Sequence, residues 1–357
     1  MRRLPVYFVL DCSESMAGSN HQQMQYGIQE ILASLRKDPH ALETVYVSVI
    51  AFAGIVRTLV PLVELYAYYP VRLPLGGGTS LGKALEHLMN EMDRHLIKST
   101  PDVKGDWKPM VYLFTDGRPT DECKNMIYRW QKHYSRRCTL VAIGLGKGVD
   151  FEVLKQLTPN CLAFEELNDD NFKKFFKWLS SSILTHSQSL GAGKTEQAGV
   201  PFSSDNFSEH YLNLMKDQAK PKEQVDDQCV TLVGRCANTA RPYLMKFERE
   251  TAYQAPVDLG LNLKYDRFAL SLCCPIDDDY FTWTDVNHAV QEINTNLLKG
   301  APECPCCGAE TAFAMCGCGN LMCYDGETEY VVCPWCRRQV SFGQGGDEGF
   351  DVKRGRG

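Results

Sequence analysis

The chain has 357 residues, of which 44% are hydrophobic and 23% are charged, a composition typical of folded globular proteins rather than disordered ones. This length favours two domains over a single small core. With 38 Lys and Arg against 44 Asp and Glu, the formal net charge is −6, so the chain as a whole lacks the basic field that would hold nucleic acid or an anionic membrane.

The first residues superficially resemble a secretion signal. Met1-Arg2-Arg3 precede an apolar run over Leu4–Leu10, but the run ends at once in Asp11 and no small-residue cleavage pattern follows. No apolar run approaches the roughly 18–20 residues that a membrane helix needs. We therefore expect a buried first strand and a cytoplasmic protein.

The first 185 residues alternate between two patterns. Short, continuous apolar runs rich in β-branched and aromatic residues are typical of strands buried on both faces of a parallel sheet. Apolar residues spaced by three and four indicate helices with one apolar stripe, over Met24–Leu35 and Leu81–Met92. This alternation predicts a doubly wound, mostly parallel α/β domain over residues 1–185. The predicted strands are Val6–Leu10, Val45–Phe52, Met110–Thr115 and Thr139–Leu145.

The composition changes after this domain. Ser, Gly, Gln, Lys and Asp dominate residues 186–227, which predicts a linker. Residues 228–342 contain short strand-like stretches and end in crowded cysteines, which predicts a β-rich, cysteine-rich metal-binding domain. The Gly-rich, charged tail 343–357 is expected to be disordered. The strand-like stretches are Cys229–Val233, Tyr243–Phe247 and Phe268–Leu272.

Three predicted loops bring oxygen ligands to one edge of the sheet. The first strand leads into Asp11-Cys12-Ser13-Glu14-Ser15, a later strand runs into Asp116, and Gly76–Ser80 opens the helix at Leu81. In open α/β sheets, ligands bind at the carboxyl ends of the strands. Carboxylates and hydroxyls suit Mg²⁺ or Mn²⁺, and an open coordination position would accept an acidic side chain from a partner. The expected ligands are Asp11, Ser13, Ser15, Thr79 and Asp116.

These five residues match, in order and context, the metal-ion-dependent adhesion site of von Willebrand factor A (VWA) domains. The resemblance covers about residues 4–185. It implies that the two serines and the threonine approach the metal directly, that the aspartates act directly or through water, and that a Glu or Asp of the partner completes the coordination shell.

Two other interpretations of the same residues are weaker. The serines, the threonine and Asp11 could each cap a turn or a helix. Haloacid-dehalogenase-type phosphatases also place a nucleophilic Asp after the first strand, but they require a second acidic residue two positions later, where Ser13 stands here. We therefore expect no catalytic residue at this site and no enzymatic activity.

Eight of the 16 cysteines crowd into residues 304–336. Crowded cysteines in a chain without a secretion signal indicate metal more often than disulfides. Cys304 and Cys307 form one C-P-x-C knuckle, and Cys333 and Cys336 form another. Four thiolates around tetrahedral Zn²⁺ make a closed structural site, and we expect the two knuckles to share one zinc ion.

Further cysteines lie between the knuckles. Cys316, Cys318 and Cys323 raise the number of plausible ligands to seven, one short of two complete zinc sites, so either one or two Zn²⁺ ions can bind. Cys306 is a candidate for the eighth ligand. The inner three cysteines could instead be packing residues of a small β-core. Four more cysteines could add a further site, but their spacing is irregular and favours buried thiols: Cys229, Cys236, Cys273 and Cys274.

A VWA domain followed by a cysteine-rich metal domain resembles the TerY proteins of bacterial tellurium-resistance and stress systems. The resemblance implies association with a serine/threonine kinase and a PP2C-type phosphatase. We predict a non-enzymatic cytoplasmic adaptor that presents Mg²⁺ to an acidic residue of a protein partner, with neither nucleic acid nor membrane as a partner. Two alternatives stay open, namely a VWA subunit of an AAA+ ATPase machine and a RING-like ubiquitin-ligase component.

Overall fold

The computed structural model describes residues 2–102, 104–146, 149–164, 177, 179–181, 183–184, 226, 228–250, 267–285, 291–342 and 349–355. Of the predicted linker 186–227, only residue 226 belongs to these ranges. The chain divides into two compact units, the first formed by Met1–Pro74 with Thr79–Lys222 and the second by Leu75–Gly78 with Glu223–Gly357. Within the described ranges, no helix is both long enough and apolar enough to cross a membrane.

The described part of the first unit is built on a six-stranded sheet with the order β3-β2-β1-β4-β5-β6. Its strands pair in parallel except for the edge strand β3, which is antiparallel to β2. From β1 the chain moves outward through β2 and β3 and then returns to the other side of β1 with β4, so the strand order reverses between β1 and β4. The strands are β1 (Leu4–Asp11), β2 (Val45–Phe52), β3 (Val56–Glu64), β4 (Met110–Thr115), β5 (Thr139–Leu145) and β6 (Cys161–Phe164).

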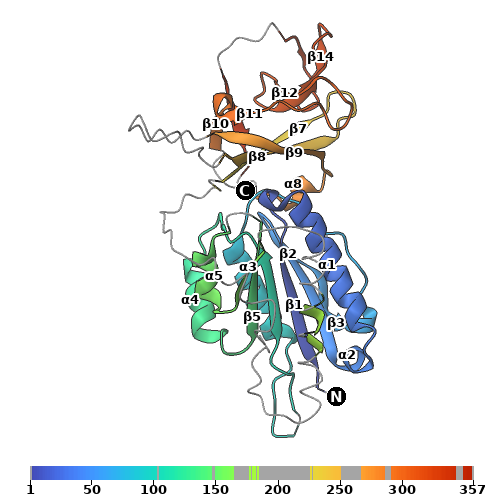
Figure 1. Ribbon diagram of the computed structural model, residues 1–357, viewed down its shortest axis with the longest axis vertical. Helices are drawn as coiled ribbons and strands as arrows, with labels where there is room; N and C mark the ends of the chain where they lie inside the picture. The colour runs from blue at the N-terminus through green and yellow to red at the C-terminus, as the bar shows by residue number, and fades with distance from the viewer. Residues whose placement is uncertain are drawn as a thin grey trace, which may run out of the picture. The chain divides into compact units, whose positions relative to one another are not determined.

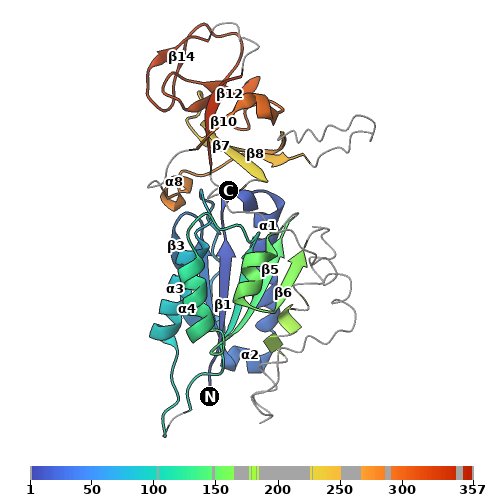
Figure 2. The same ribbon diagram turned by 90° about the vertical axis from the view of Figure 1, so that its left-hand side faces the viewer.

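Helices cover both faces of this sheet. Helix α1 lies on the opposite side of the sheet from α3 and α4 (Figures 1 and 2). The stripe of α3 packs with Tyr7, Val9 and Trp130 in one apolar cluster. The predicted fold class and both predicted helical stripes are therefore confirmed. The helices are α1 (Ser19–Leu35), α2 (Pro39–Thr44), α3 (Leu81–His95), α4 (Lys124–His133) and α5 (Phe151–Leu157), with short 3-10 turns η1 (Glu14–Met16) and η2 (Leu65–Ala67).

The central strands are buried on both faces, which explains why their sequences are apolar throughout. All eight residues of β1 are buried. Because side chains alternate along a strand, Tyr7 and Val9 reach the cluster beneath α3 while Phe8 and Leu10 point to the other face. The edge strand β3 is largely half-buried and carries Pro61, so it lacks this signal and was not predicted.

The second unit is β-rich, as predicted. Its described residues form one sheet with the order β11-β9-β8-β7-β13-β12 and the two-stranded sheets β10-β16 and β14-β15. Three of its strands contain the predicted stretches. The elements are β7 (Cys229–Arg235), β8 (Pro242–Arg249), β9 (Phe268–Pro275), α8 (Tyr280–Trp283), β10 (Gln291–Asn294), η4 (Thr295–Leu297), β11 (Leu298–Lys299), β12 (Thr311–Met315), β13 (Leu321–Tyr324), β14 (Val331–Val332), β15 (Gln339–Val340) and β16 (Asp351–Arg354).

The predicted disorder of the tail 343–357 is wrong for its last strand. β16 pairs antiparallel with β10, and Val352 is buried in the core of the unit. The Arg354 guanidinium donates hydrogen bonds to the carbonyl oxygens of Asp226 (2.6 Å) and Cys229 (2.7 Å). Composition averaged over the tail concealed this short strand, while residues 343–348 and 356–357 lie outside the described ranges.

Candidate metal centres

The two aspartates of the predicted magnesium site lie at the carboxyl edge of the first sheet. Asp11 is the last residue of β1, and Asp116 directly follows β4. Because β1 and β4 are neighbouring parallel strands, their carboxyl ends lie side by side. This is the point at which the strand order reverses, where open α/β sheets bind ligands.

Hydrogen bonds fix the Asp11 carboxylate and link its loop to that of Asp116. One carboxylate oxygen of Asp11 accepts from the Ser13 amide (3.0 Å), and the other accepts from the Thr115 hydroxyl (2.6 Å). The Thr115 oxygen accepts in turn from the Gly117 amide (3.1 Å). Gly117 has a φ of +78°, and a Cβ there would lie 2.2 Å from a carbonyl oxygen, so this tight turn requires glycine.

The serine hydroxyls have a spacing that suits Mg²⁺. Ser13 and Ser15 are buried, and their Oγ atoms lie 3.0 Å apart. Two neighbouring ligands in an octahedron with Mg–O distances of about 2.1 Å also lie about 3.0 Å apart. The two hydroxyls therefore have the spacing of adjacent coordination positions.

The third loop is hydrogen-bonded to the loop that follows Asp116. Thr79 is buried one residue before the N-cap of α3, after Gly78, which has a φ of +92°. Its amide donates to the Thr120 hydroxyl (2.8 Å), and the Thr120 amide donates to the Thr79 carbonyl oxygen (2.9 Å). The structure thus brings all three predicted loops to one edge of the sheet, and the role of their side chains as metal ligands stays a prediction.

The electrostatics of this edge favour a bound cation. Burial, together with the negative charge of Asp116, raises the pKa of Asp11 from 3.8 to about 7, although hydrogen bonds from Ser13 and Thr115 act in the opposite direction. A carboxylate whose ionised form is disfavoured in this way is stabilised by a divalent cation. The donors at this edge, which are hydroxyls and carboxylates, therefore fit Mg²⁺ or Mn²⁺.

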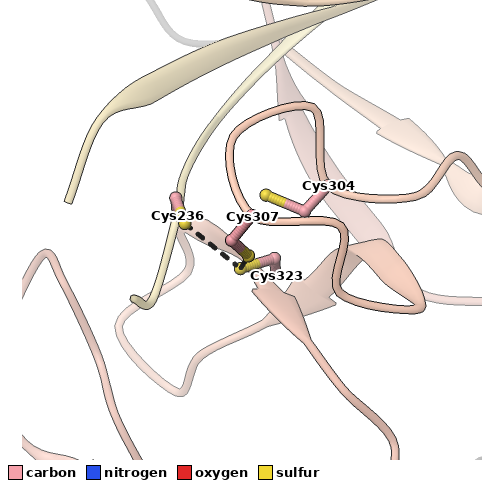
Figure 3. Close-up of side chains that lie close together, drawn as sticks. All are labelled: Cys236, Cys304, Cys307 and Cys323. Carbon is pink, nitrogen blue, oxygen red and sulfur yellow. Dashed lines mark hydrogen bonds between the residues drawn. The ribbon is translucent and has the colours of Figure 1, made fainter. Parts of the chain in front are cut away.

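The cysteines of the second unit gather in two groups. Among the residues that the structure describes, two sets of four sulfur atoms lie within 4.8 Å of one another in each set. All seven predicted cysteine ligands belong to one or other set. The first set is Cys236, Cys304, Cys307 and Cys323 (Figure 3), and the second is Cys316, Cys318, Cys333 and Cys336.

The distances within each set suit tetrahedral zinc. The sulfur of Cys323 lies 3.8 Å from those of Cys236 and Cys307. In the second set the distances are 3.7 Å from Cys316 to Cys336 and 3.9 Å from Cys318 to Cys333. Four sulfurs at about 2.3 Å from a tetrahedral Zn²⁺ would be separated by about 3.8 Å. Both sets therefore fit one Zn²⁺ each.

Hydrogen bonds favour the thiolate form that zinc requires at some of these sulfurs, whereas burial raises the pKa of four others, namely Cys304, Cys316, Cys323 and Cys333. The Ala237 amide donates to Cys323 (3.1 Å) and the Thr239 amide donates to Cys236 (3.3 Å). Burial opposes ionisation of Cys236, but the hydrogen bonds from Thr239 outweigh it and lower the pKa of this thiol to about 7. Burial also raises the pKa of Cys318, but hydrogen bonds from Asn320 outweigh this effect and lower the pKa to about 7.

Two predictions about ligand pairing are wrong. The knuckles Cys304–Cys307 and Cys333–Cys336 do not share a site, because they belong to different sets. The eighth sulfur of the two sets belongs not to Cys306 but to Cys236, which the irregular spacing favoured as a buried thiol. Figure 3 shows its side chain directed at the sulfurs of the first set, from a chain segment far upstream of the others.

Cys236 lies in the same kind of turn as the knuckle cysteines. The carbonyl oxygens of Cys236, Cys304 and Cys333 each accept a hydrogen bond from the amide four residues later, at 2.8–3.0 Å. In each turn that later residue has a positive φ. Three residues after the first cysteine, the two knuckles place a second cysteine, whereas the turn of Cys236 places Thr239. The turn of Cys236 thus lacks the C-x-x-C spacing. The sequence signal for an eighth cysteine ligand is that seven ligands are one short of two complete zinc sites. The residues with positive φ are Ala240, Gly308 and Arg337.

Comparison with known families agrees with this division. Residues 6–178 match the von Willebrand factor type A domain, and residues 226–357 match the TerY-C metal binding domain. Among solved structures, the chain is similar to proximal thread matrix protein 1 from the mussel byssus, with 20% identity, 50% of this chain and 47% of that chain covered, and a TM-score of 0.39. It is also similar to a von Willebrand factor type A protein from Catenulispora acidiphila, with 17% identity, coverage of 51% and 42%, and a TM-score of 0.40. The chain spans about half the length of the mussel protein.

Proposed function

We propose that this chain, which joins a von Willebrand factor type A domain to a TerY-C metal binding domain, is a non-enzymatic adaptor that binds a protein partner through Mg²⁺ held at the VWA site. The two family matches confirm the predicted TerY-type organisation. The observation that carries the proposal is the convergence of three loops at the carboxyl edge of the sheet, with a buried Asp11 and with Ser13 and Ser15 at octahedral spacing.

The chemistry of the donors determines what kind of partner group would bind. Carboxylates from Asp11 and Asp116 only neutralise a divalent cation formally, and hydroxyls from Ser13, Ser15 and Thr79 add no further negative charge. Mg²⁺ at this edge would supply a positively charged coordination position to a ligand from outside the chain. An acidic side chain of the partner is the ligand that this position favours.

The second unit has a structural role in this proposal. A zinc site with four cysteine ligands is closed, so it has no open position for substrate or activated water. We assign one Zn²⁺ to each cysteine set, which stabilises a unit whose apolar core is smaller than that of the first unit. Neither set is assigned a catalytic step.

The pairing of these two domain types supports a setting for the adaptor. We propose that it acts in cytoplasmic stress signalling of the bacterial tellurium-resistance type. Its partners there would be a serine/threonine kinase and a PP2C-type phosphatase, one of which presents the acidic residue.

The metal site is tested first on the purified full chain. Calorimetric titration with Mn²⁺ should reveal one site that is lost in Asp11→Ala and in Thr79→Ala. Thr158→Ala is a matched control, because Thr158 is also a buried threonine. Its hydroxyl donates to the carbonyl oxygen of Leu140, which lies near the amino ends of β4 and β5, at the opposite ends of the strands from the metal site. Absence of binding in the unmodified chain would contradict the proposed function.

The adaptor role is tested by copurification with the candidate kinase and phosphatase. Omission of Mg²⁺ is preferable to a chelator, since a chelator would also remove zinc. We expect partner binding to require Mg²⁺, to fail with Thr79→Ala and to persist with Thr158→Ala. Partner binding that is indifferent to both Mg²⁺ and Thr79→Ala would exclude a metal-mediated contact.

A further inference from the structure

Thr120 and Asp121 make contacts that the proposed metal ligands do not explain. Thr120 is buried and exchanges two hydrogen bonds with the backbone of Thr79, using its hydroxyl as acceptor and its own amide as donor. It stands four residues after Asp116 in the same loop. These two bonds therefore join the backbone of one proposed ligand to the loop that carries another.

Asp121 holds the start of helix α3, the helix that begins just after Thr79. Ser80 is at the N-cap position, but its hydroxyl donates to the Gly54 carbonyl oxygen (2.9 Å) rather than capping the helix. The amides of Gly82 and Lys83 donate instead to the Asp121 carboxylate, at 3.1 Å and 3.0 Å. The first-turn donors of the helix are thus satisfied from a distant segment.

The close approach of the two segments depends on a glycine. A Cβ at Gly82 would lie 3.0 Å from an Asp121 carboxylate oxygen and 3.1 Å from the Cys123 Cα. On its other side, the Thr79–Ser80 segment is anchored to the turn between β2 and β3, because the Ser80 amide donates to the Ala53 carbonyl oxygen (2.8 Å). Thr79 is therefore held between two fixed segments.

We propose that Thr120 and Asp121 are positioning residues of the metal site, which clamp the Thr79 loop to the Asp116 loop and so set the affinity for the divalent cation. The proposal rests on the proposed function of that site. Neither residue touches the cation. Their effect comes from holding a hydroxyl and a carboxylate on separate loops at the mutual position that a rigid octahedral ion demands.

The test compares isosteric variants of two buried threonines in the full chain. Thr120→Val removes the acceptor for the Thr79 amide and keeps the shape of the side chain, whereas Thr120→Ser retains the acceptor. Thr158→Val removes a buried hydroxyl that donates to a carbonyl oxygen and accepts from the Asn160 amide at the far edge of the sheet. Mn²⁺ affinity and melting temperature are measured for each variant.

We expect Thr120→Val and Asp121→Ala to weaken Mn²⁺ binding roughly tenfold or more, in the range seen when groups that orient metal ligands are removed. Thr120→Ser should restore the affinity. Thr158→Val should lower the melting temperature while leaving the affinity unchanged.

The proposal is overturned if Thr120→Val binds Mn²⁺ as tightly as the unmodified chain, or if Thr158→Val weakens binding to the same extent. The second result would show that general destabilisation of the fold, rather than loss of the contact with Thr79, weakens Mn²⁺ binding. If the unmodified chain itself binds no Mn²⁺, the proposed function fails and the clamp with it, so the two failures are distinguishable.

Discussion

In the first unit, Asp11 lies at the end of a strand whose eight residues are all buried, whereas in the second unit Cys236 and Cys323 are themselves members of the apolar core. The first unit has its own large core beneath α3, and its proposed ligands lie at the edge of the sheet. The second unit has strands as short as the two residues of β14 and places its sulfurs where apolar side chains would otherwise pack.

This difference separates two uses of a metal ion. Where a core folds without the ion, the ligands can be held in an arrangement that is electrostatically unfavourable, and the ion can exchange and accept a ligand from a partner. Where the ligands form part of the core, loss of the ion leaves little else to hold the strands together. The following predictions test this comparison, from the largest expected effect to the smallest.

Removal of zinc should unfold the second unit and spare the first. Structural zinc contributes about 10–16 kcal/mol of binding free energy at pH 7 in small zinc-dependent domains. After treatment with a strong chelator we expect loss of amide-exchange protection in β7, β8 and β13, while the amides of β1 and β4 remain protected. If the amides of β7 and β13 stay protected after complete loss of zinc, the second unit folds without its metal ions, as we expect of the first.

Substitution of one long-range ligand should remove one zinc ion. Cys236→Ser breaks the first cysteine set and leaves the second intact, so the zinc content should fall from two ions to one per chain. Cys274→Ser is the matched control, because Cys274 is a partly exposed cysteine outside both sets. Elemental analysis of the two variants measures the difference. Two zinc ions retained in Cys236→Ser would contradict the assignment of the eighth ligand.

Loss of the Asp11 charge should stabilise the metal-free first unit, whereas loss of zinc should destabilise the second unit. Asp11→Asn keeps the size of the side chain and removes its buried carboxylate. Burial and Asp116 raise the pKa of that carboxyl group to about 7. We expect the variant to lose Mn²⁺ binding, while the metal-free protein at pH 8 becomes more stable by on the order of a few kcal/mol. Thermal unfolding with and without Mn²⁺ measures both effects. A large destabilisation of the metal-free variant would place Asp11 among residues that the core requires.

The raised pKa of Asp11 also predicts a pH dependence. The folded-state pKa of about 7 exceeds the ordinary 3.8, so between these values Asp11 keeps a proton in the folded metal-free protein that it has lost in the unfolded chain. The contribution of Asp11 to stability therefore falls as the pH rises from about 4 to about 7. Mn²⁺ must displace this proton, so its apparent affinity should weaken roughly tenfold from pH 8 to pH 6. Calorimetric titration at both pH values measures this change. In Asp11→Asn this contribution to the pH dependence of stability between pH 4 and pH 7 should be absent.

The sequence alone determined the elements whose residues are buried on every side. Val45–Phe52, Met110–Thr115 and Thr139–Leu145 coincide with β2, β4 and β5, because central parallel strands are apolar on both faces and need no context to be recognised. The polar residues that end or follow such strands are equally recognisable, and so the sequence alone places Asp11 and Asp116 at one edge of the sheet.

Only the tertiary structure decided how the cysteines divide. Cys236 stands 87 residues before Cys323, and its turn depends on a positive φ at Ala240, a residue type that does not signal this conformation. The sulfurs that form one set depend on which turns come close together when the sheet forms. Spacing along the chain identifies only cysteines that lie in the same turn. For the same reason, the sequence did not reveal that Thr120 and Asp121 hold the Thr79 loop, since those bonds join segments that meet only after folding.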